Sequence, residues 1–151
     1  DYYASRGLGD VYKRQMQTTV TLAADGNGDE AGIAVMGHDY SALALHRGAA
    51  GNELVLYRGK VTARTAEGVA EEEGVLRLPF AGDTVTLRLY FEDGGTVHYA
   101  YELNGQETLL DGSFPAAKST WSGAKPALFA RNTANRAGGQ GRFGAVSFEC
   151  L

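Results

Sequence analysis

Apolar and polar residues alternate along much of this chain, most clearly in two neighbouring segments near its middle. In residues 83–92, Val85, Leu87, Leu89 and Phe91 occupy every second position, which is the pattern of a strand with one buried face. Residues 96–103 repeat the alternation, and the intervening Asp-Gly-Gly at 93–95 is a tight-turn signal. The pattern therefore predicts a β-hairpin.

Short apolar runs bounded by Gly, Asn or Asp recur elsewhere, and Asn104-Gly105 marks a second hairpin turn. Further strands are predicted at residues 17–23, 32–36, 40–47, 53–58, 75–80, 127–130 and 143–150. Nine or ten strands without a convincing helix indicate an all-β, antiparallel two-sheet β-sandwich.

Two polar segments interrupt the strands and are expected to be loops. Residues 65–73 read TAEGVAEEE, where Gly68 and three successive glutamates favour a solvated loop over a helix. Residues 131–141 read RNTANRAGGQG and predict a mobile surface loop before the last strand.

Residues 1–15, DYYASRGLGDVYKRQ, show neither a period of 2 nor one of 3.6. The segment resembles translated sequencing-adaptor text, which recurs at the ends of proteins derived from environmental (metagenome) DNA assemblies. We therefore expect a non-native segment, with a natural disordered arm as the alternative, and assign the domain to residues 16–151. This interpretation makes the chain a C-terminal fragment of a longer bacterial protein and leaves its localisation unknown.

Composition narrows the possible classes. The 151 residues, 44% of them hydrophobic, are enough for one domain with its own core. The single cysteine, Cys150, excludes an internal disulfide and a four-cysteine zinc site. A net charge of −4 argues against a nucleic-acid partner, and no apolar run is long enough to span a membrane.

Two motifs suggest ligand loops but lack the expected context. Residues 139–144 match G-x-G-x-x-G, yet only seven residues follow, too few for a dinucleotide-binding unit, so a flexible loop is expected. Asp25, Asn27 and Asp29 resemble the start of a calcium loop, but Glu30 replaces the turn glycine and Met36 the final glutamate. We interpret this segment as a hairpin turn.

No constellation for catalysis or metal binding emerges. His46 and His98 are expected on strand faces and His38 in a turn, so neither metal nor cofactor is predicted. Asp39 could pair with one of the glutamates at 71–73 as the carboxylates of a glycosidase, but glutamate runs are usually solvated. No catalytic residue is assigned.

Aromatic side chains are the remaining candidates for ligand contact, because their flat faces stack on sugar rings. Tyr57 is considered as well, but the candidate carbohydrate contacts are Tyr40, Tyr90 and Trp121. Tyr90 alternates away from the apolar face of its strand, and Trp121 could instead close one end of the sandwich.

Three segments in register resemble one family. Residues 31–43 read AGIAVMGHDYSAL, residues 99–105 YAYELNG and residues 121–129 WSGAKPALF. Together they resemble the C-terminal concanavalin A-like β-sandwich of family 43 glycoside hydrolases, the β-xylosidase and α-arabinofuranosidase group. The agreement runs from about residue 18 to 148. The end of the chain, GAVSFEC at 144–150, departs from the family pattern, and Pro126 suggests an edge strand.

This resemblance implies an accessory domain that does not catalyse by itself. In the family the catalytic acids lie on a separate five-bladed propeller upstream, which is missing here and would be the partner within the same polypeptide. The resemblance further implies that a sandwich loop, here residues 59–74 or 116–123, helps to close the substrate pocket in hemicellulose degradation.

Two rival hypotheses remain. The chain could be a free-standing carbohydrate-binding module for xylo- or arabino-oligosaccharides, because sandwiches host many functions. It could also be an independent glycosidase, which we do not expect. Sugar linkage and oligomeric state are left open by the sequence.

Overall fold

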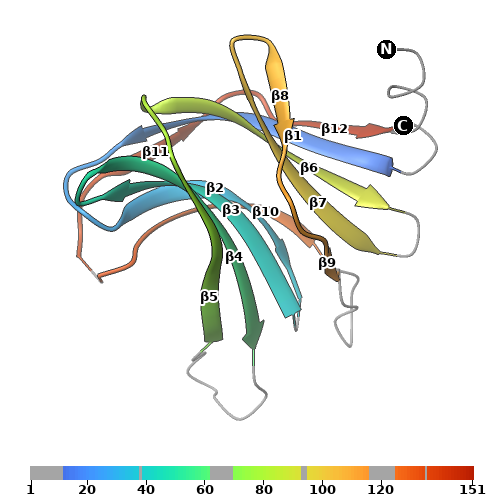
Figure 1. Cartoon of the computed structure of the whole chain (residues 1–151), viewed down its shortest axis with the longest axis horizontal. Helices are drawn as coiled ribbons and strands as arrows, with labels where there is room; N and C mark the ends of the chain where they lie inside the picture. The colour runs from blue at the N-terminus through green and yellow to red at the C-terminus, as the bar shows by residue number, and fades with distance from the viewer. Residues whose placement is uncertain (1–11, 38, 62–69, 93–94, 116–124, 135) are drawn as a thin grey trace.

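The protein folds into two antiparallel β-sheets packed face to face (Figure 1). The computed structural model describes residues 12–37, 39–61, 70–92, 95–115, 125–134 and 136–151. All twelve regular elements in these ranges are strands, so the predicted all-β sandwich is confirmed. Within the same ranges no helix is long and apolar enough to cross a bilayer.

The seven-stranded sheet has the order β11-β1-β6-β7-β8, with β12 added beside β1 and β9 beside β7. The predicted hairpin is confirmed, with Phe91 opposite Val97, and Asn104 takes a positive φ of 54° at the next turn. The strands of this sheet are β1 (Tyr12–Ala23), β6 (Thr84–Glu92), β7 (Thr96–Leu103), β8 (Gln106–Leu109), β9 (Phe114–Pro115), β11 (Gln140–Phe143) and β12 (Ser147–Cys150).

The five-stranded sheet has the order β10-β2-β3-β4-β5. β10 is an edge strand of this sheet and carries Pro126, as the sequence suggested. The strands are β2 (Asp29–Met36), β3 (Asp39–Gly48), β4 (Gly51–Val61), β5 (Ala70–Pro79) and β10 (Lys125–Asn132).

The core lies between the two sheets and is built from the alternate apolar positions of each strand. One polar contact crosses it, where the hydroxyls of Ser41 in β3 and Tyr99 in β7 lie 2.8 Å apart. The ring of Tyr99 also packs edge-on against Phe114. The largest fully buried apolar side chains are Tyr99, Ile33, Leu43, Leu45, Leu54, Leu56, Leu87 and Leu89.

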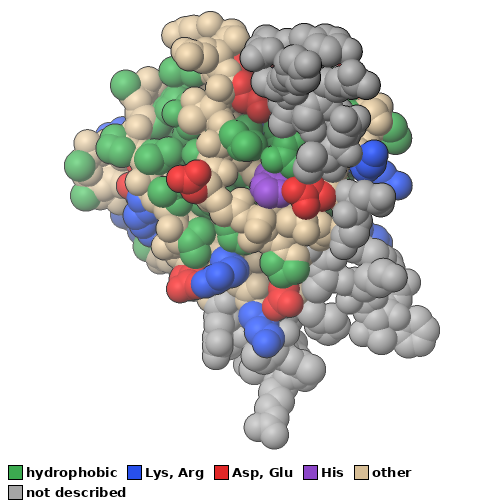
Figure 2. Space-filling model, turned by 45° about the vertical axis from the view of Figure 1, so that its right-hand side comes forward, with side chains coloured by type: hydrophobic (Ala, Val, Ile, Leu, Met, Phe, Trp, Pro, Cys, Tyr) green, Lys and Arg blue, Asp and Glu red, His purple; other side chains and the backbone are tan. Residues whose placement is uncertain are grey.

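The surface is mixed in character. Figure 2 shows hydrophobic side chains over the upper part of one face, with acidic and basic side chains among them and side by side near its lower edge. Several large apolar side chains remain exposed, and the most exposed of those described, Val146, Phe148 and Leu151, lie near the C-terminus.

Parts of the two predicted loops are strands. β5 begins at Ala70, so Glu72 and Glu73 belong to a sheet, whereas residues 65–69 lie outside the described residues. Arg131 and Asn132 extend β10. Ion pairs explain this difference, because Arg58 binds Glu73 and Arg131 binds Glu72, so charged residues that remain partly exposed still pair between strands.

The predicted last strand, residues 143–150, is divided in two. Gln140 and Gly141, expected in a flexible loop, start β11, and β12 begins only at Ser147. Between them the amide of Gly144 donates to the carbonyl of Thr19 at 2.8 Å. Main-chain pairing with β1 therefore orders a glycine-rich segment that carries little apolar signal.

The first strand begins earlier than the expected domain boundary. Tyr12 to Gln15 lie in β1, where Arg14 is opposite both Cys150 and Phe91. Sheet hydrogen bonds require no side-chain period, which is why this stretch pairs without the alternation that marks a core strand. The origin of residues 1–15 stays a prediction, and residues 1–11 lie outside the described part of the chain.

The turn at residues 24–28 was expected within a hairpin, but it joins β1 and β2, which belong to different sheets. The carboxylate of Asp29 accepts the backbone amides of Asp25 at 2.7 Å and Gly26 at 3.1 Å, and also the amide of Asn132. In the described ranges no group of three or more His, Cys, Asp or Glu side chains is placed to hold a metal ion.

A buried carboxylate, Glu30 of β2, organises the outward face of the five-stranded sheet. Its side chain is fully buried. It accepts hydrogen bonds from Tyr57 at 2.5 Å and from the Nε of Arg131 at 2.6 Å, and lies 3.0 Å from the ring nitrogen of His46. Burial alone raises the pKa of this carboxyl, but the hydrogen bonds from His46, Tyr57 and Arg131 outweigh it and lower the pKa.

The alternation of buried and exposed residues along the core strands predicts which leucines can be truncated without loss of stability. Leu87→Ala should lower the free energy of unfolding by about 2–5 kcal/mol, because Leu87 is fully buried between the sheets. Leu103→Ala, at a side chain 40% exposed, is the matched control and should change it by no more than about 0.5 kcal/mol. Urea unfolding measures both, and equal effects would contradict the difference in burial between the two leucines.

Glu30, His46, Tyr57 and Arg131 form a hydrogen-bonded group that we call the Glu30 network. It predicts that the contribution of Glu30 to the free energy of unfolding depends on pH. Glu30→Gln should lower the free energy of unfolding at pH 7 by about 2–3 kcal/mol, because Arg131 loses a buried counter-charge. A lowered folded-state pKa stabilises above the unfolded pKa of about 4.3 and is lost as pH falls through the folded value. The difference between the two proteins should therefore shrink below about pH 4. A difference that stays constant down to about pH 2 would contradict this prediction.

Candidate functional site

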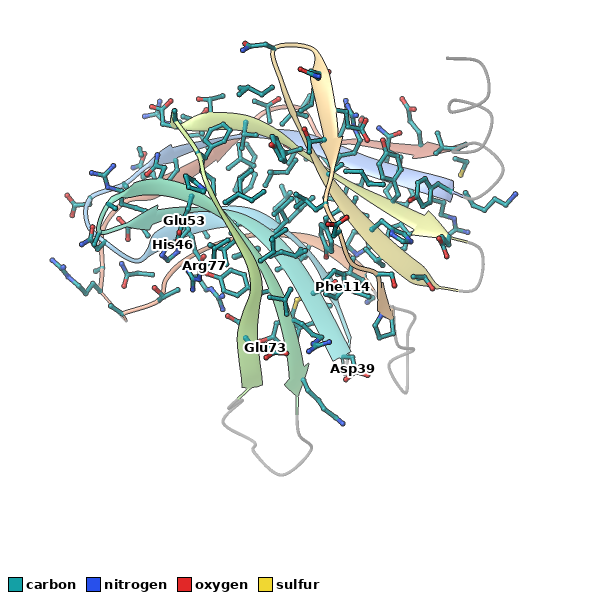
Figure 3. The ribbon with its side chains drawn as sticks, viewed as in Figure 1. Asp39, His46, Glu53, Glu73, Arg77 and Phe114 are labelled. Atoms are coloured by element: carbon teal, nitrogen blue, oxygen red, sulfur yellow. The ribbon has the colours of Figure 1, made fainter. Side chains whose placement is uncertain are left out.

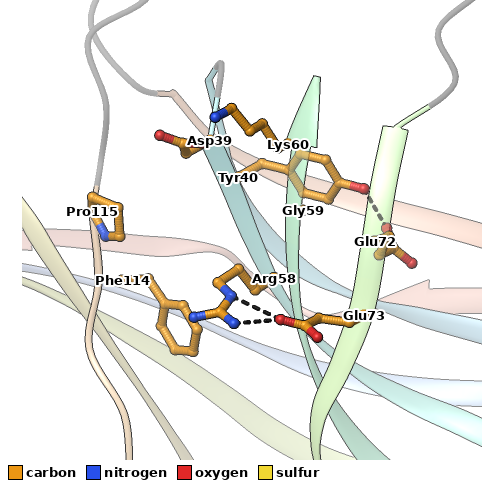
Figure 4. Close-up of a pocket in the computed structure, with 9 residues that line it drawn as sticks. All are labelled: Asp39, Tyr40, Arg58, Gly59, Lys60, Glu72, Glu73, Phe114 and Pro115. Atoms are coloured by element: carbon orange, nitrogen blue, oxygen red, sulfur yellow. Dashed lines mark hydrogen bonds and ion pairs between the residues drawn. The ribbon is translucent and has the colours of Figure 1, made fainter. Parts of the chain in front are cut away.

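One end of the sandwich contains a cavity of about 510 Å³, within the size range of ligand pockets. It lies at the end of the five-stranded sheet where β3 and β5 begin and β4 ends. β9, which belongs to the other sheet, covers one side of it. We call it the end cavity; as Figure 4 shows, it is lined by Asp39, Tyr40, Arg58, Gly59, Lys60, Glu72, Glu73, Phe114 and Pro115.

Strand order explains why these residues meet. β3, β4 and β5 are antiparallel neighbours, so the start of β3 lies beside the end of β4 and the start of β5. Phe114 comes from the opposite sheet, because β9 pairs with β7. In Figure 3, Asp39 and Glu73 lie near one end of this sheet, while His46, Glu53 and Arg77 gather at its other end.

Two pairs of side chains fix the walls of the cavity (Figure 4). Arg58 donates to Glu73 through Nε at 3.1 Å and through a second guanidinium nitrogen, and both side chains are exposed. The hydroxyl of Tyr40 donates to Glu72 at 2.6 Å. Glu72 is held from its other side by Arg131, so the Glu30 network continues into the cavity wall.

Tyr40 depends on the glycine opposite it. Its partner across the ladder is Gly59, and a side chain there would collide with the Tyr40 ring. The ring therefore lies flat over the glycine and is only 9% exposed. Burial first, and then the hydrogen bond to Glu72, raise the pKa of the Tyr40 hydroxyl, which keeps it a donor.

Two of the three candidate carbohydrate contacts, Tyr40 and Tyr90, are described by the structure, and they do not come together. Tyr40 lines the end cavity. Tyr90 lies on the outward face of the seven-stranded sheet, 4% exposed, beneath the ring of Tyr12 at 4.8 Å. Burial and the hydrogen bond to Glu107 raise its pKa to about 12. Trp121 lies outside the described residues. Sugar contact by any of them stays a prediction.

Three of the acidic residues considered for a catalytic pair, Asp39, Glu72 and Glu73, line the end cavity together, whereas the side chain of Glu71 lies outside the described part of the structure. Glycosidases need carboxyls that reach the glycosidic oxygen and the anomeric carbon. Here Glu73 is engaged by Arg58, and Glu72 by Tyr40 and Arg131. This arrangement ties β3, β4, β5 and β10 together.

Sequence reasoning missed the basic and apolar residues of the site. Arg58 and Lys60 alternate near the end of β4, and the glutamates at 71–73 lie opposite in β5. This complementary charge pattern was a usable signal, but only once the two segments were known to be paired. Phe114 and Arg131 gave no such signal, because they reach the site from strands distant in sequence.

A family model for the β-xylosidase C-terminal concanavalin A-like domain matches residues 11–149. No curated protein matches the chain. Among solved structures, similar folds occur in an engineered family 43 glycoside hydrolase with endo-xylanase and exo-arabinofuranosidase activity (TM-score 0.75, 15% identity) and in a bifunctional family 43 protein from Bacteroides eggerthii (0.72, 15%). A third is a xylan β-1,4-xylosidase from Bacillus halodurans (0.69, 12%).

These matches cover 92%, 90% and 91% of this chain, but only 29%, 18% and 28% of the three solved proteins. The chain thus spans less than a third of the length of each. At these identities the solved structures establish the fold, while the family model, which covers nearly all of the sequence, establishes membership. The chain belongs to the family of concanavalin A-like domains that form the C-terminal part of family 43 β-xylosidases.

Proposed function

We propose that this chain is the non-catalytic accessory domain of a family 43 enzyme of the β-xylosidase or α-arabinofuranosidase type, acting in hemicellulose degradation. Its role is to support an upstream catalytic propeller and to shape the substrate pocket of that propeller. The observation that carries the proposal is the combination of a near-complete family match with coverage of only 18–29% of the similar enzymes.

The direction of the chain suggests which end contacts the catalytic domain. In a C-terminal domain the polypeptide enters from upstream, here through the start of β1 at Tyr12. The antiparallel pairing places the start of β1 beside the ends of β6 and β12. We call the end of the sandwich at which β1 begins the entry end. β1 runs from there to the far end, and β2 runs back, so the β2–β3 turn between Met36 and Asp39 lies at the entry end.

The end cavity therefore lies at the entry end of the sandwich. Interfaces between domains are typically more polar than permanent ones, and Arg58, Lys60 and Glu73 give this end an exposed rim of both charges. The segments that leave β4 and β9, which include the two loops expected to approach the catalytic pocket, start from the same end. These features support docking of the catalytic domain here.

The first test is activity. The 151-residue chain should release no nitrophenol from aryl β-xylosides or aryl α-arabinofuranosides, whereas the complete polypeptide, recovered from a clean reading frame, should do so. Turnover by the isolated chain, or an upstream sequence that does not encode a propeller, would overturn the proposal.

The second test locates the contact. In the complete polypeptide, Lys60→Glu should speed limited proteolysis between the two domains, because it reverses an exposed charge on the docking end. Arg142→Glu is the matched control, since Arg142 is exposed on β11 at the far end. Equal cleavage rates for the two variants would show that the domains meet elsewhere.

A further inference from the structure

The outward face of the five-stranded sheet is hollowed beside the end cavity. The hollow has a volume of about 500 Å³. Its floor is a row of alanines in register on three adjacent strands, with Ala34 of β2 opposite both Ala127 of β10 and Ala42 of β3. Ala34 and Ala42 are nearly buried at the bottom of the hollow, whereas Ala127, on the edge strand, is half-exposed; we call the hollow the alanine groove.

Larger side chains two positions away on either side form the walls. Phe129 stands on one side of the row and Tyr40 on the other, with about 6.6 Å along each strand between the row and each wall. The groove thus has an apolar floor and an aromatic side chain in each wall. Flat apolar surfaces of this kind pack against the C–H faces of sugar rings.

Arg131 supplies fixed polar groups at the groove. Its guanidinium lies 5.0 Å from the ring centre of Tyr57 and 5.6 Å from that of Phe129. It is held through Nε by Glu30 and through both terminal nitrogens by Glu72. These contacts use three of the five N–H groups of an arginine, and the side chain remains 38% exposed, so donors are presented in a fixed orientation.

The charges at the groove favour an uncharged ligand. Arg131 faces two carboxylates, those of Glu30 and Glu72, so the positive charge is already balanced and an anion gains little attraction. Glu30 is fully buried, but the partly exposed carboxylate of Glu72 and the guanidinium of Arg131 can still exchange hydrogen bonds with hydroxyl groups. A neutral sugar chain, apolar on its ring faces and rich in hydroxyls at its edges, satisfies both requirements.

We propose that the alanine groove is a binding site for a neutral oligosaccharide segment, with a sugar ring packed on the half-exposed Ala127 and Phe129 and its hydroxyls bonded to Arg131 and Glu72. Tyr40 and Glu72 line both this groove and the end cavity. A bound chain would therefore run along the outside of the sheet toward the entry end. The site does not depend on contact with a catalytic domain, so it can be tested on this chain alone.

The test is calorimetric titration of the 151-residue chain with xylotetraose, arabinotetraose and cellotetraose, with an oligogalacturonate as the acidic comparison. At least one neutral probe should bind saturably and more tightly than the acidic one. Ala127→Leu, which fills the floor, and Phe129→Ala, which removes a wall, should each weaken binding by at least about fivefold. Both lie on an edge strand, and unchanged melting temperatures would show that they fold.

Leu103→Ala is the matched control, because Leu103 is an exposed apolar side chain on the other sheet, and it should leave binding unchanged. Absence of saturable binding up to about 10 mM of every neutral probe would overturn the proposal. Tighter binding of the acidic probe, or equal binding by the two groove variants and the native chain, would also overturn it. None of these outcomes bears on docking of the catalytic domain, which is measured in the complete polypeptide.

Discussion

The buried carboxylate of Glu30 is the interaction on which the arrangement of the candidate site depends. It occupies the outward face of a sheet, where a charge would normally be solvated, and it is stabilised there by donors from three other strands. Arg131 is fixed by Glu30, Glu72 is fixed by Arg131, and Tyr40 is fixed by Glu72. One buried charge thus determines the position of a side chain at the boundary between the end cavity and the alanine groove.

Register is the second constraint. In the five-stranded sheet the register aligns Ala127, Ala34 and Ala42 on three adjacent strands. It also places Tyr40 opposite Gly59, which leaves room for the ring. A shift of one residue in any of these pairs would turn the alanines inward and expose the core leucines. The same register therefore builds both the core and the outer surface, and the surface features are as well defined as the core.

The sequence predicted most of the fold because the core strands carry an alternating pattern that reports directly on burial. It failed where order comes from pairing between distant polar residues. Glu72 and Arg131 both lie in segments that looked like loops, and these two partners are 59 residues apart in the sequence. Tyr40 was proposed as a contact from its chemistry alone, and it does line a cavity. Arg58, Lys60 and Phe114 could not be found in this way, because only the topology brings them together.

Hydrogen exchange is the measurement that tests most directly whether this domain serves as a support docked through its entry end. Backbone amides of Tyr40, Gly59 and Lys60 would be compared between the isolated chain and the complete polypeptide, with Arg142 at the far end as the internal reference. The account predicts slower exchange at the three cavity positions in the complete polypeptide and equal exchange at Arg142. Equal exchange at all four positions, or protection confined to the far end, would contradict it.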